Sequence, residues 1–422
     1  MITHITHPFR RTGNIRPTRL LATVAALSVT APVVAPTPAA LANTGTTPGG
    51  GTRSAPTAPA AARPSASLYV PEPTGAHPVG ATSLHLRDTS RHDPWVAEAT
   101  ARELMVSLWY PTRSTGRLRA QYMTPMESEL LLKDAGITSV PYDVLSRTRT
   151  NAFTDSAPAG RKRSLPLVVL SPGFTKPRSV LTGLAEDLAS NGYVVAAVEH
   201  TYESVGTSFP DGRVTTCVAC QSPDRTEAFW KKLTRGRAAD VSFVIDQLTD
   251  TRRKWWGASL IDPSRIAMVG HSAGGAGTQA AMVADPRIDA GIDIDGLTYD
   301  DIPDSGLARP FLFLGRQANF TPGMPSAARW ERDWPRLTQW KRWLVVAGTV
   351  HASFTDVALL AEQVGIGSGA DLPPIRSIEI TRAYTRAFLD LHLRNRIQPV
   401  LDGSSPRYPE VMFCAPERRT CQ

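Results

Sequence analysis

The pentapeptide Gly270-His271-Ser272-Ala273-Gly274 has the residue types of a nucleophilic serine held in a tight turn. It directly follows the apolar run 266–269 and precedes a small-residue stretch, 275–283, that is typical of a helix. Glycines at its ends, Gly270 and Gly274, allow a sharp strand-to-helix turn, and such a turn exposes the serine oxygen at the start of the helix. A strand before G-x-S-x-G and a helix after it distinguish a nucleophile elbow from an ordinary glycine-rich turn. We therefore predict that Ser272 attacks a carbonyl carbon.

A serine hydroxyl becomes a good nucleophile when a neighbouring base takes its proton. After an elbow of this kind the acid and then the histidine follow in the chain, and only His351 and His392 come after Ser272. His392 falls within an amphipathic helical pattern, where a structural histidine is the ordinary interpretation. His351 follows the apolar run 343–347, in a loop at the edge where sites of parallel sheets are built. We predict that His351 is the base.

The acid that orients the imidazole should come from the end of a neighbouring strand. The predicted strand 311–314 is followed by no carboxylate within its turn, whereas the preceding strand ends in Asp293-Ile294-Asp295-Gly296. Asp295, the last residue before the glycine, is the predicted acid. Asp293, two residues earlier on the same side, stays the alternative, and its other interpretation is a structural carboxylate that caps a loop.

Two backbone N–H groups are needed to stabilise the negative oxygen that forms during the attack. The residue after the nucleophile, Ala273, supplies one of them. Ser171-Pro172-Gly173-Phe174, after another apolar strand, is expected to supply the second through the Phe174 N–H. The Phe174 side chain is then expected to line the pocket.

The first 42 residues have the pattern of a signal peptide. Arginines precede the apolar run Leu20 to Ala31, and small residues ending in Ala40-Leu41-Ala42 give a cleavage pattern. The alternative, a membrane anchor, is disfavoured because a spanning helix needs roughly 20 apolar residues. Arg10-Arg11 leaves twin-arginine export open, although we favour the general secretory route. We thus expect an extracellular protein with no transmembrane segment after cleavage near Ala42.

Export also bears on the four cysteines, because an even number in a secreted chain indicates disulfides. Close spacing favours bridges 217–220 and 414–421, and a bridge from the 217 loop to the C-terminal tail is the rival. The two pairs are too far apart in the sequence to indicate a zinc site, and we expect neither metal nor cofactor. The disulfide candidates are Cys217, Cys220, Cys414 and Cys421.

Composition excludes a peptide, a linker protein and a disordered chain. With 42% hydrophobic and 20% charged residues, the 422-residue chain can bury a large core. Lys and Arg number 46 against 38 Asp and Glu, and removal of residues 1–42, with four arginines and no acid, lowers the net charge from +8 to +4. Because the charges are interleaved, nothing indicates nucleic acid as a partner. The oligomeric state is left open.

The elements that must position these residues alternate between strand and helix. Residues 43–67 are rich in Gly, Thr, Pro and Ala and predict a flexible leader, and folding should begin near Leu68 and extend to 422. Because the apolar runs lack alternation, the strands should be covered on both faces in a mostly parallel sheet. Residues 112–163 fit no strand position and are interpreted as a cap-like insertion. The expected strands are 104–110, 166–170, 193–198, 265–269, 290–294, 311–314 and 343–347, and the expected helices are 179–190, 229–248 and 377–395.

Other polar and aromatic residues give weaker indications of a functional role. Glu199-His200 ends a predicted strand, and His200 is expected to fasten a loop. Four tryptophans between 330 and 343 are expected in the core, with an acyl-binding groove as the alternative. The acids at 300, 301 and 304 lack the ligand pattern of a calcium loop.

Together, the segments 166–174, 187–200, 270–275 and 292–295 resemble the plasma-type platelet-activating-factor acetylhydrolase family of α/β-hydrolases, over about 74–395. The resemblance implies an α/β-hydrolase fold, the triad Ser272, Asp295 and His351, and Phe174 and Ala273 as oxyanion donors. In cutinase-like polyester hydrolases the acid follows one strand later. Residue Ala273, where many members carry a bulkier residue, and the stretch 112–163 depart from the family pattern, so the resemblance does not imply a phospholipid substrate.

These observations predict a secreted serine esterase or lipase that acts through an acyl-enzyme on a small-molecule or lipid-like ester. Short acyl chains are favoured, because no long apolar groove is legible in the sequence. A polyester or cutin hydrolase with the same triad is the closest alternative. A serine peptidase and a catalytically silent binding protein on the same scaffold are further alternatives.

Overall fold

The computed structural model describes residues 67–250 and 254–422. The predicted signal peptide 1–42 and nearly all of the predicted leader 43–67 lie outside the described residues. The described residues belong to one compact unit, Pro64–Gln422.

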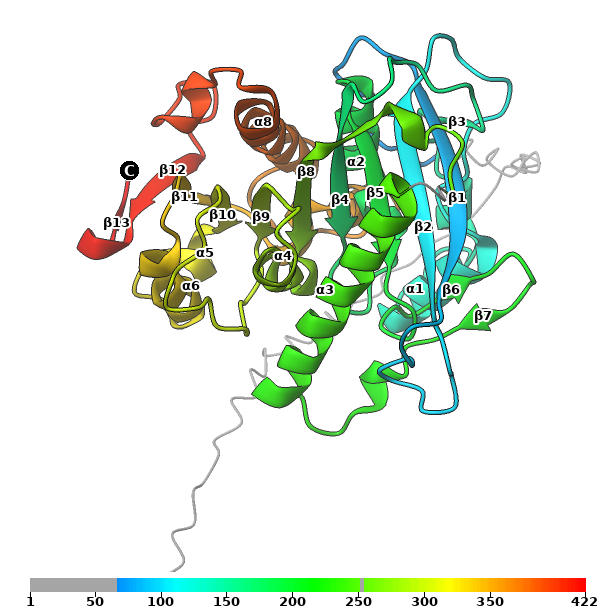
Figure 1. Cartoon of the computed structure of the whole chain (residues 1–422), viewed down its shortest axis with the longest axis horizontal. Coiled ribbons are helices and arrows are strands. Elements are labelled where there is room, and N and C mark those ends of the chain that lie inside the picture. Colours follow the sequence, from blue (N-terminus) through cyan, green and yellow to red (C-terminus); the bar gives the residue numbers. More distant parts are fainter. Residues whose placement is uncertain (1–66, 251–253) are drawn as a thin grey trace, which may run out of the picture. The chain divides into compact units, whose positions relative to one another are not determined.

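Strands and helices alternate along most of this unit (Figure 1). The strands are β1 (Val79–Asp88), β2 (Arg102–Pro111), β3 (Phe153–Thr154), β4 (Leu165–Ser171), β5 (Val194–Glu199), β6 (Thr207–Ser208), β7 (Val214–Thr215), β8 (Ile261–His271), β9 (Ala290–Ile294), β10 (Phe311–Arg316), β11 (Lys341–Val346), β12 (Val411–Ala415) and β13 (Thr420–Cys421). The helices are α1 (Pro125–Asp134), α2 (Thr182–Ser190), α3 (Glu227–Thr249), α4 (Ala273–Ala284), α5 (Gln317–Phe320), α6 (Ala328–Asp333), α7 (Asp356–Gln363) and α8 (Pro374–Arg394).

The large sheet has the order β13-β12-β11-β10-β9-β8-β4-β5-β2-β1-β3. Its central strands, from β11 to β5, all pair in parallel, whereas β2 and β1 on one side and β12 and β13 on the other are antiparallel. This order places β8, which carries the Ser272 turn at its end, between β4 and β9. The ends of β4, β8 and β9 are therefore neighbours, and the predicted mostly parallel sheet is confirmed.

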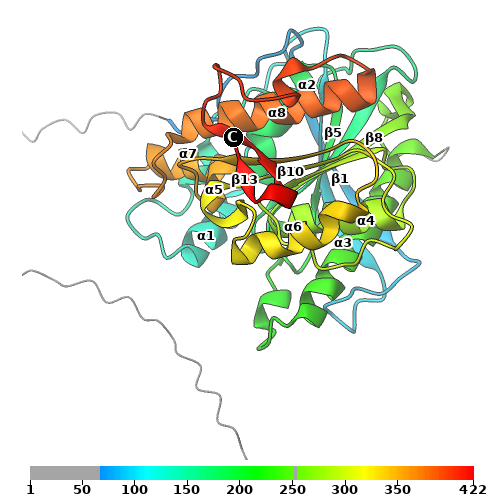
Figure 2. The same ribbon diagram turned by 90° about the vertical axis from the view of Figure 1, so that its left-hand side faces the viewer.

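Helices cover both faces of the sheet, as Figure 2 shows with the sheet seen edge-on. Helices α2 and α8 lie on one face, and α3, α4 and α6 lie on the other. Each face has its own hydrophobic cluster, and the central strands contribute to both because alternate side chains point to opposite faces. Apolar runs without alternation are thus explained by burial on two sides.

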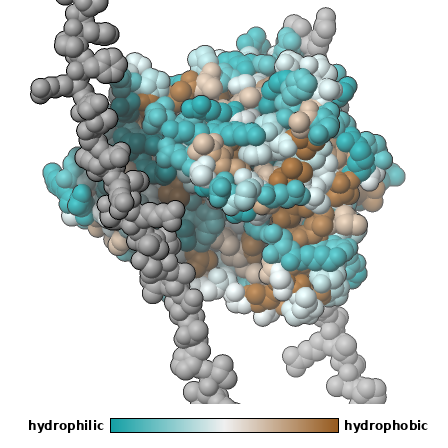
Figure 3. All heavy atoms as spheres, turned by 90° about the horizontal axis from the view of Figure 1, so that it is seen from below, coloured by the Kyte–Doolittle hydropathy of each residue, from teal (hydrophilic) through white to brown (hydrophobic). Residues whose placement is uncertain are grey.

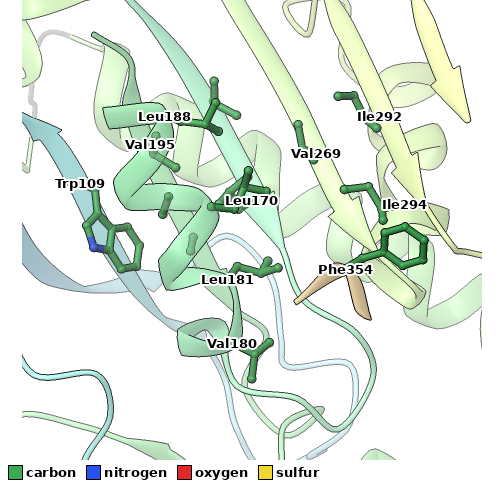
Figure 4. Packing of buried hydrophobic residues seen from close by; sticks show 14 of the residues in the cluster. Trp109, Leu170, Val180, Leu181, Leu188, Val195, Val269, Ile292, Ile294 and Phe354 are labelled. Carbon is green, nitrogen blue, oxygen red and sulfur yellow. The ribbon is translucent and has the colours of Figure 1, made fainter. Parts of the chain in front are cut away.

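One cluster also fixes the position of the loop that carries His351. In Figure 4, Leu181 and Leu188 lie over Leu170 and Val195 of the sheet, and Phe354 lies near Ile294. Phe354 belongs to the short 3-10 helix His351–Phe354 and is 3% exposed. Burial of this phenyl ring therefore anchors the His351 turn beside the end of β9.

One prediction about the elements needs correction. Residues 112–163 do contain a strand, because Phe153 and Thr154 of β3 pair in parallel with β1 at the sheet edge. The remainder of that stretch includes α1, whose first turn is closed by a capping box between Thr124 and Glu127. Strands β1, β12 and β13, for which the sequence analysis has no prediction, extend the sheet at both edges.

Candidate active site

Ser272 lies in a strained turn between β8 and α4. Its φ of 57° and ψ of −120° belong to a region that residues other than glycine rarely adopt. The Ser272 N–H donates to the Ile294 carbonyl at 2.8 Å, and the Ala276 N–H donates to the Ser272 carbonyl at 3.1 Å. The turn is thereby held between the end of β9 and the first turn of α4. Such strain is typical of residues held in place for function.

The two predicted elbow glycines stand where a side chain has no room. A Cβ atom on Gly270 would lie 1.9 Å from the Gly274 carbonyl oxygen, and one on Gly274 would lie 2.0 Å from the Ser171 carbonyl oxygen. Both positions need glycine because the backbone itself approaches so closely. The loop after β4 therefore packs directly against the Ser272 turn.

The structure brings His351 and Asp295 together at the edge where β9 and β11 end. His351 Nδ1 lies 2.5 Å from Asp295 Oδ2. The Asp295 side chain is fully buried, whereas the His351 side chain is 45% exposed. Asp295 thus holds one ring nitrogen, and His351 lines the same cleft as Ser272.

Arg316, a residue that the sequence analysis missed, contacts the same carboxylate. Its backbone N–H donates to Asp295 Oδ1 at 2.8 Å, and its side-chain Nε lies 2.7 Å from Asp295 Oδ2. Asp295 adopts a positive φ of 56°, which the flanking contacts maintain. Arg316 is the last residue of β10, and the available signal was a cation two residues after the predicted strand 311–314.

Asp293 lies apart from the histidine. Its Oδ1 accepts from the Gly296 N–H at 2.9 Å, and burial, followed by the charge of Asp295, raises the pKa of Asp293 well above its usual range. A raised pKa favours the neutral form of this carboxyl group, and its contact with the Gly296 N–H shapes the turn after β9. Of the two aspartates, Asp295 is the one in contact with His351.

His271, the residue before Ser272 in the elbow, supports the His351 loop. Its Nε2 lies 2.9 Å from the His351 carbonyl oxygen, and the two rings lie 4.6 Å apart. Burial, with a further contribution from His351, lowers the pKa of His271 well below its usual range. A neutral His271 can donate from Nε2 to that carbonyl, and thus ties the elbow to the loop that carries His351.

His271, Asp295 and His351 also form a group whose possible metal ligand atoms lie within 4.8 Å of one another. Their mutual hydrogen bonds occupy His271 Nε2, His351 Nδ1 and Asp295 Oδ2. The Arg316 guanidinium stands at the same carboxylate and would repel a cation. The donor set therefore fits a hydrogen-bonded cluster better than a metal site.

The predicted oxyanion loop, residues 171–174, lies beside Ser272. A Cβ atom on Gly173 would lie 3.4 Å from Ser272 Cβ. The Ala273 N–H is the first of α4, where a helix leaves its N–H groups without partners inside the helix. Within the described ranges, the Phe174 N–H also donates to no acceptor. Both backbone groups are available to a negative oxygen.

A buried ion network lies under this loop. Arg237 of α3 donates to the Pro172 carbonyl at 2.5 Å and to Ser171 Oγ at 3.2 Å, and its Nε pairs with Glu203 at 2.7 Å. His200 Nε2 lies 2.9 Å from Ser171 Oγ, which agrees with the expectation that His200 fastens a loop.

The same network continues away from the loop through Asp240. His200 Nδ1 lies 2.8 Å from Asp240 Oδ2, and Arg102 Nη2 pairs with the same oxygen at 2.8 Å. Arg102 also pairs with Asp93 at 2.7 Å. All of these side chains are at most 1% exposed. The network therefore joins β2, α3 and the end of β5 to the loop after β4.

A cleft of about 220 Å³ opens at Ser272 and His351. Its aromatic members are Trp230, Tyr299 and Phe320, of which Phe320 is 2% exposed, and its polar members include Arg316 and Ser326. The residues that line it are Trp230, Ser272, Ala273, Asp295, Leu297, Tyr299, Arg316, Phe320, Ser326 and His351.

The weaker sequence candidates have structural roles. Trp330 and Trp343 are at most 1% exposed and lie in the core, as expected, whereas Trp334 and Trp340 are partly buried and pack against it. His392 packs on Trp340 and Phe388, and burial lowers its pKa to about 4. The acids at 300, 301 and 304 pair with arginines or lysine.

The disulfides in the structure are Cys217–Cys220 and Cys414–Cys421, the pairing that close spacing favours. The second bridge links β12 to β13 at the edge of the sheet. The first lies in the loop that follows β7, where Cys217 packs on the cluster that contains Ala273 and Phe229. The Cys217–Cys220 bridge therefore supports the side of the cleft that Ala273 lines.

The parallel sheet, the helices on both faces and the strand-turn-helix at Ser272 define an α/β-hydrolase. The chain belongs to the family described as platelet-activating factor acetylhydrolase, isoform II, which matches residues 63–254 and 257–396. The family resemblance predicted from the sequence is thereby confirmed.

Relatives within this class carry different names. A ferulic acid esterase from Streptomyces cinnamoneus of known structure is 40% identical, has a TM-score of 0.73, and is matched over 83% of this chain and 100% of that chain. A probable 1-alkyl-2-acetylglycerophosphocholine esterase from Arthroderma benhamiae is 28% identical over 383 residues, 82% of this chain and 94% of that protein. A cutinase from Thermobifida fusca is 26% identical over 267 residues, 54% of this chain and 77% of that protein.

Proposed function

We propose that this protein is a serine hydrolase of carboxylic esters that works through an acyl-enzyme. Membership of the family and the named relatives make it a carboxylic ester hydrolase. The observation that carries the mechanism is the contact between His351 Nδ1 and the buried Asp295, at the cleft that Ser272 lines. A histidine oriented in this way presents its other nitrogen to a serine hydroxyl.

In the proposed reaction His351 takes the Ser272 proton as Oγ attacks the ester carbonyl. The Ala273 and Phe174 N–H groups stabilise the tetrahedral oxyanion. His351 then protonates the leaving alcohol, and Ser272 retains the acyl group. Water, activated by the same imidazole, hydrolyses the acyl-enzyme and restores Ser272. These steps are complete without a metal ion or cofactor.

We further propose that short acyl groups react faster than long chains. The cleft at Ser272 has about 220 Å³ and is partly lined by aromatic side chains, and this size suits a compact acyl group. A polyester hydrolase of the cutinase kind stays the alternative. Its acid would follow β10, and Arg316 occupies the end of that strand here.

Hydrolysis of p-nitrophenyl esters from acetyl to palmitoyl, by the protein and by Ser272→Ala, tests this proposal. We expect kcat/KM to fall with chain length and the variant to lose turnover of all of them. Equal turnover by the variant would contradict the assignment of Ser272. Release of soluble acids from a polyester film at a rate above that of the short esters would favour the polyester alternative.

We also propose that the protein is secreted after cleavage of residues 1–42. Two disulfides support an oxidising compartment, and among the described residues there is no helix with the length and apolarity to span a bilayer. The N-terminal sequence of protein recovered from the culture medium tests this proposal. It should begin near Asn43, and recovery of the intact N-terminus from the cell fraction alone would contradict it.

A further inference from the structure

A cavity of about 350 Å³ lies where part of the stretch 112–163 faces β1 and β2, and we call it the hydroxyl cavity. Among the described residues, none lines both this cavity and the cleft at Ser272. The residues that line it are Ala81, Thr82, Ser83, Ser107, Trp109, Ala120, Gln121, Tyr122, Met123, Thr124, Glu127, Thr150, Thr154, Asp155, Arg178, Ser179 and Thr182. A volume of this size is in the range of small-molecule binding sites, so the hydroxyl cavity is a candidate site of its own.

Hydroxyl groups dominate the lining of the hydroxyl cavity. Eight of its 17 residues are serine or threonine. A hydroxyl group can donate or accept, so this lining can match the hydroxyl groups of a ligand in either direction. Trp109 and Tyr122, which are at most 5% exposed, add the apolar surface of two aromatic rings. On the right-hand side of Figure 3, where Figure 1 places β1 and α1, hydrophilic and hydrophobic residues also intermingle on the surface. The lining therefore suits a ligand that combines several hydroxyl groups with a carbon skeleton.

Two nearly buried side chains at the hydroxyl cavity have a polar atom without a partner. Ser179 is 7% exposed, and its Oγ makes no hydrogen bond with a described residue. Trp109 is 5% exposed, and its Nε1–H donates to no acceptor within residues 67–250 and 254–422. In Figure 4 this nitrogen points away from the labelled aliphatic side chains of the core. Because buried hydroxyl and indole groups usually have partners, both atoms are available to a ligand.

The Arg178 guanidinium at the hydroxyl cavity is held in place and keeps a free donor. Its Nε donates to Ser107 Oγ at 2.8 Å, and its Nη1 donates to Glu199 at 3.1 Å. Within the described part of the chain, its Nη2 has no acceptor. A side chain that is already fixed loses little conformational entropy when its remaining N–H group binds a ligand oxygen.

Charges at the hydroxyl cavity disfavour an anion. The positive charge of Arg178 is offset by Glu199, with which it pairs at 3.1 Å. Two further carboxylates, Glu127 and Asp155, line the cavity, and Asp155 pairs with no cation among the described residues. These carboxylates would repel a phosphate or a carboxylate ligand. A neutral hydroxyl group, in contrast, can donate to a carboxylate oxygen.

We propose that the hydroxyl cavity binds a neutral sugar in its pyranose form. The sugar oxygens have donors in Trp109 Nε1 and Arg178 Nη2, and the sugar hydroxyl groups have an acceptor in the Asp155 carboxylate. The C–H groups of the sugar ring gain from burial against the rings of Trp109 and Tyr122. This inference is independent of the proposed function, because the proposed triad lies at the other cleft.

Saturation-transfer NMR with D-glucose, D-galactose, D-mannose and D-xylose tests this proposal. For the unmodified protein we expect at least one of these sugars to bind with a Kd in the millimolar range. Trp109→Phe and Ser179→Ala should each weaken binding of that sugar about fivefold, the value of one hydrogen bond. The matched controls Trp256→Phe and Ser190→Ala should leave the Kd unchanged, since Trp256 is 63% exposed outside the cavity and Ser190 Oγ accepts from the Gly75 N–H.

The outcomes separate this inference from ester hydrolysis. Ser272→Ala should bind the sugar as tightly as the unmodified protein. Absence of binding for all four sugars would overturn the inference, and so would an unchanged Kd in both Trp109→Phe and Ser179→Ala. Binding of D-glucuronate or tetramethylammonium in place of the neutral sugars would also overturn it, because the cavity would then select a charged ligand.

A variant at an exposed position covers the case in which Trp109→Phe and Ser179→Ala do not fold. Asp155 is exposed and has a positive φ of 48°, which asparagine tolerates. Asp155→Asn should weaken binding of the sugar about fivefold, because one carboxylate oxygen is replaced by a donor. Asp304→Asn is its matched control, since the Asp304 side chain is 96% exposed and lies outside the cavity. Equal Kd values in these two variants would overturn the inference.

Discussion

Two aspartates, two residues apart on one strand end, have opposite surroundings. Asp295 touches His351 and Arg316, whereas Asp293 is buried against the Gly296 N–H. The sequence pattern favours Asp295 but retains Asp293, because both side chains point to the same side of β9. The hydrogen bonds that separate them join residues 56 and 21 positions apart, and a single sequence does not reveal such pairs.

Replacement of each aspartate by asparagine is therefore expected to have unequal effects. Asp295→Asn should lower kcat about a thousandfold, because the amide no longer orients His351 or stabilises its charged form. Asp293→Asn, the matched control, should keep kcat within about threefold, since burial favours the neutral form of Asp293 and the amide oxygen can still accept from Gly296. Steady-state kinetics on p-nitrophenyl acetate measures both, and a larger loss in Asp293→Asn would reverse the assignment.

At the scale of elements, the loop after β4 is held by side chains from two other elements. Arg237 from α3 and His200 from the end of β5 both contact Ser171, and Arg237 also contacts the Pro172 carbonyl. These contacts fix the peptides that precede the Phe174 N–H. Helical arginines are usually exposed, so Arg237 gives no sign in the sequence that it is buried under a loop.

Ser171→Ala removes two of these contacts without adding volume. We expect kcat to fall about tenfold with little change in KM, because a displaced oxyanion donor weakens the transition state more than the bound ester. Ser190→Ala is the matched control, since Ser190 Oγ is equally buried and accepts from the Gly75 N–H at 2.9 Å, away from the cleft. If both variants lose the same thermal stability but neither loses kcat, the network has no role in positioning the loop.

At the scale of the whole molecule, the parallel centre of the sheet could be predicted, and its edges could not. Strands β4, β5 and β9 and the second half of β8 contain apolar runs without alternation because both faces are covered. Strand β1 is half exposed and carries polar residues, such as Thr82 and Ser83, that do not distinguish it from a loop. Strands β3 and β13 have two residues each, too few for any pattern.

Buried carboxyl groups should make stability depend on pH. Burial raises the pKa of Asp356 to about 7 and that of Glu199 to about 7. An unfolded aspartate has a pKa of about 4. Between that pH and about pH 7 the folded protein binds a proton that the unfolded chain has released, so the free energy of unfolding falls as pH rises. Above the pKa of the group in the folded protein, the free energy of unfolding stops falling.

Asp356→Asn tests this dependence, because the amide cannot ionise and its oxygen can still accept from the Gly183 N–H. Urea unfolding at about pH 5 and about pH 7.5 should show a decline in the unfolding free energy that is smaller in the variant, by on the order of 1 kcal/mol. A decline of equal size in both proteins would mean that Asp356 is ionised in the folded state throughout this range.

Covalent trapping of the nucleophile tests the central claim most directly. A fluorophosphonate probe reacts with a serine that an adjacent histidine activates. We predict that peptide mass spectrometry locates one probe per chain on Ser272, that activity is lost in proportion to labelling, and that Ser272→Ala takes up no probe. Complete inactivation with the probe on a different residue, or full activity with Ser272 labelled, would contradict the account.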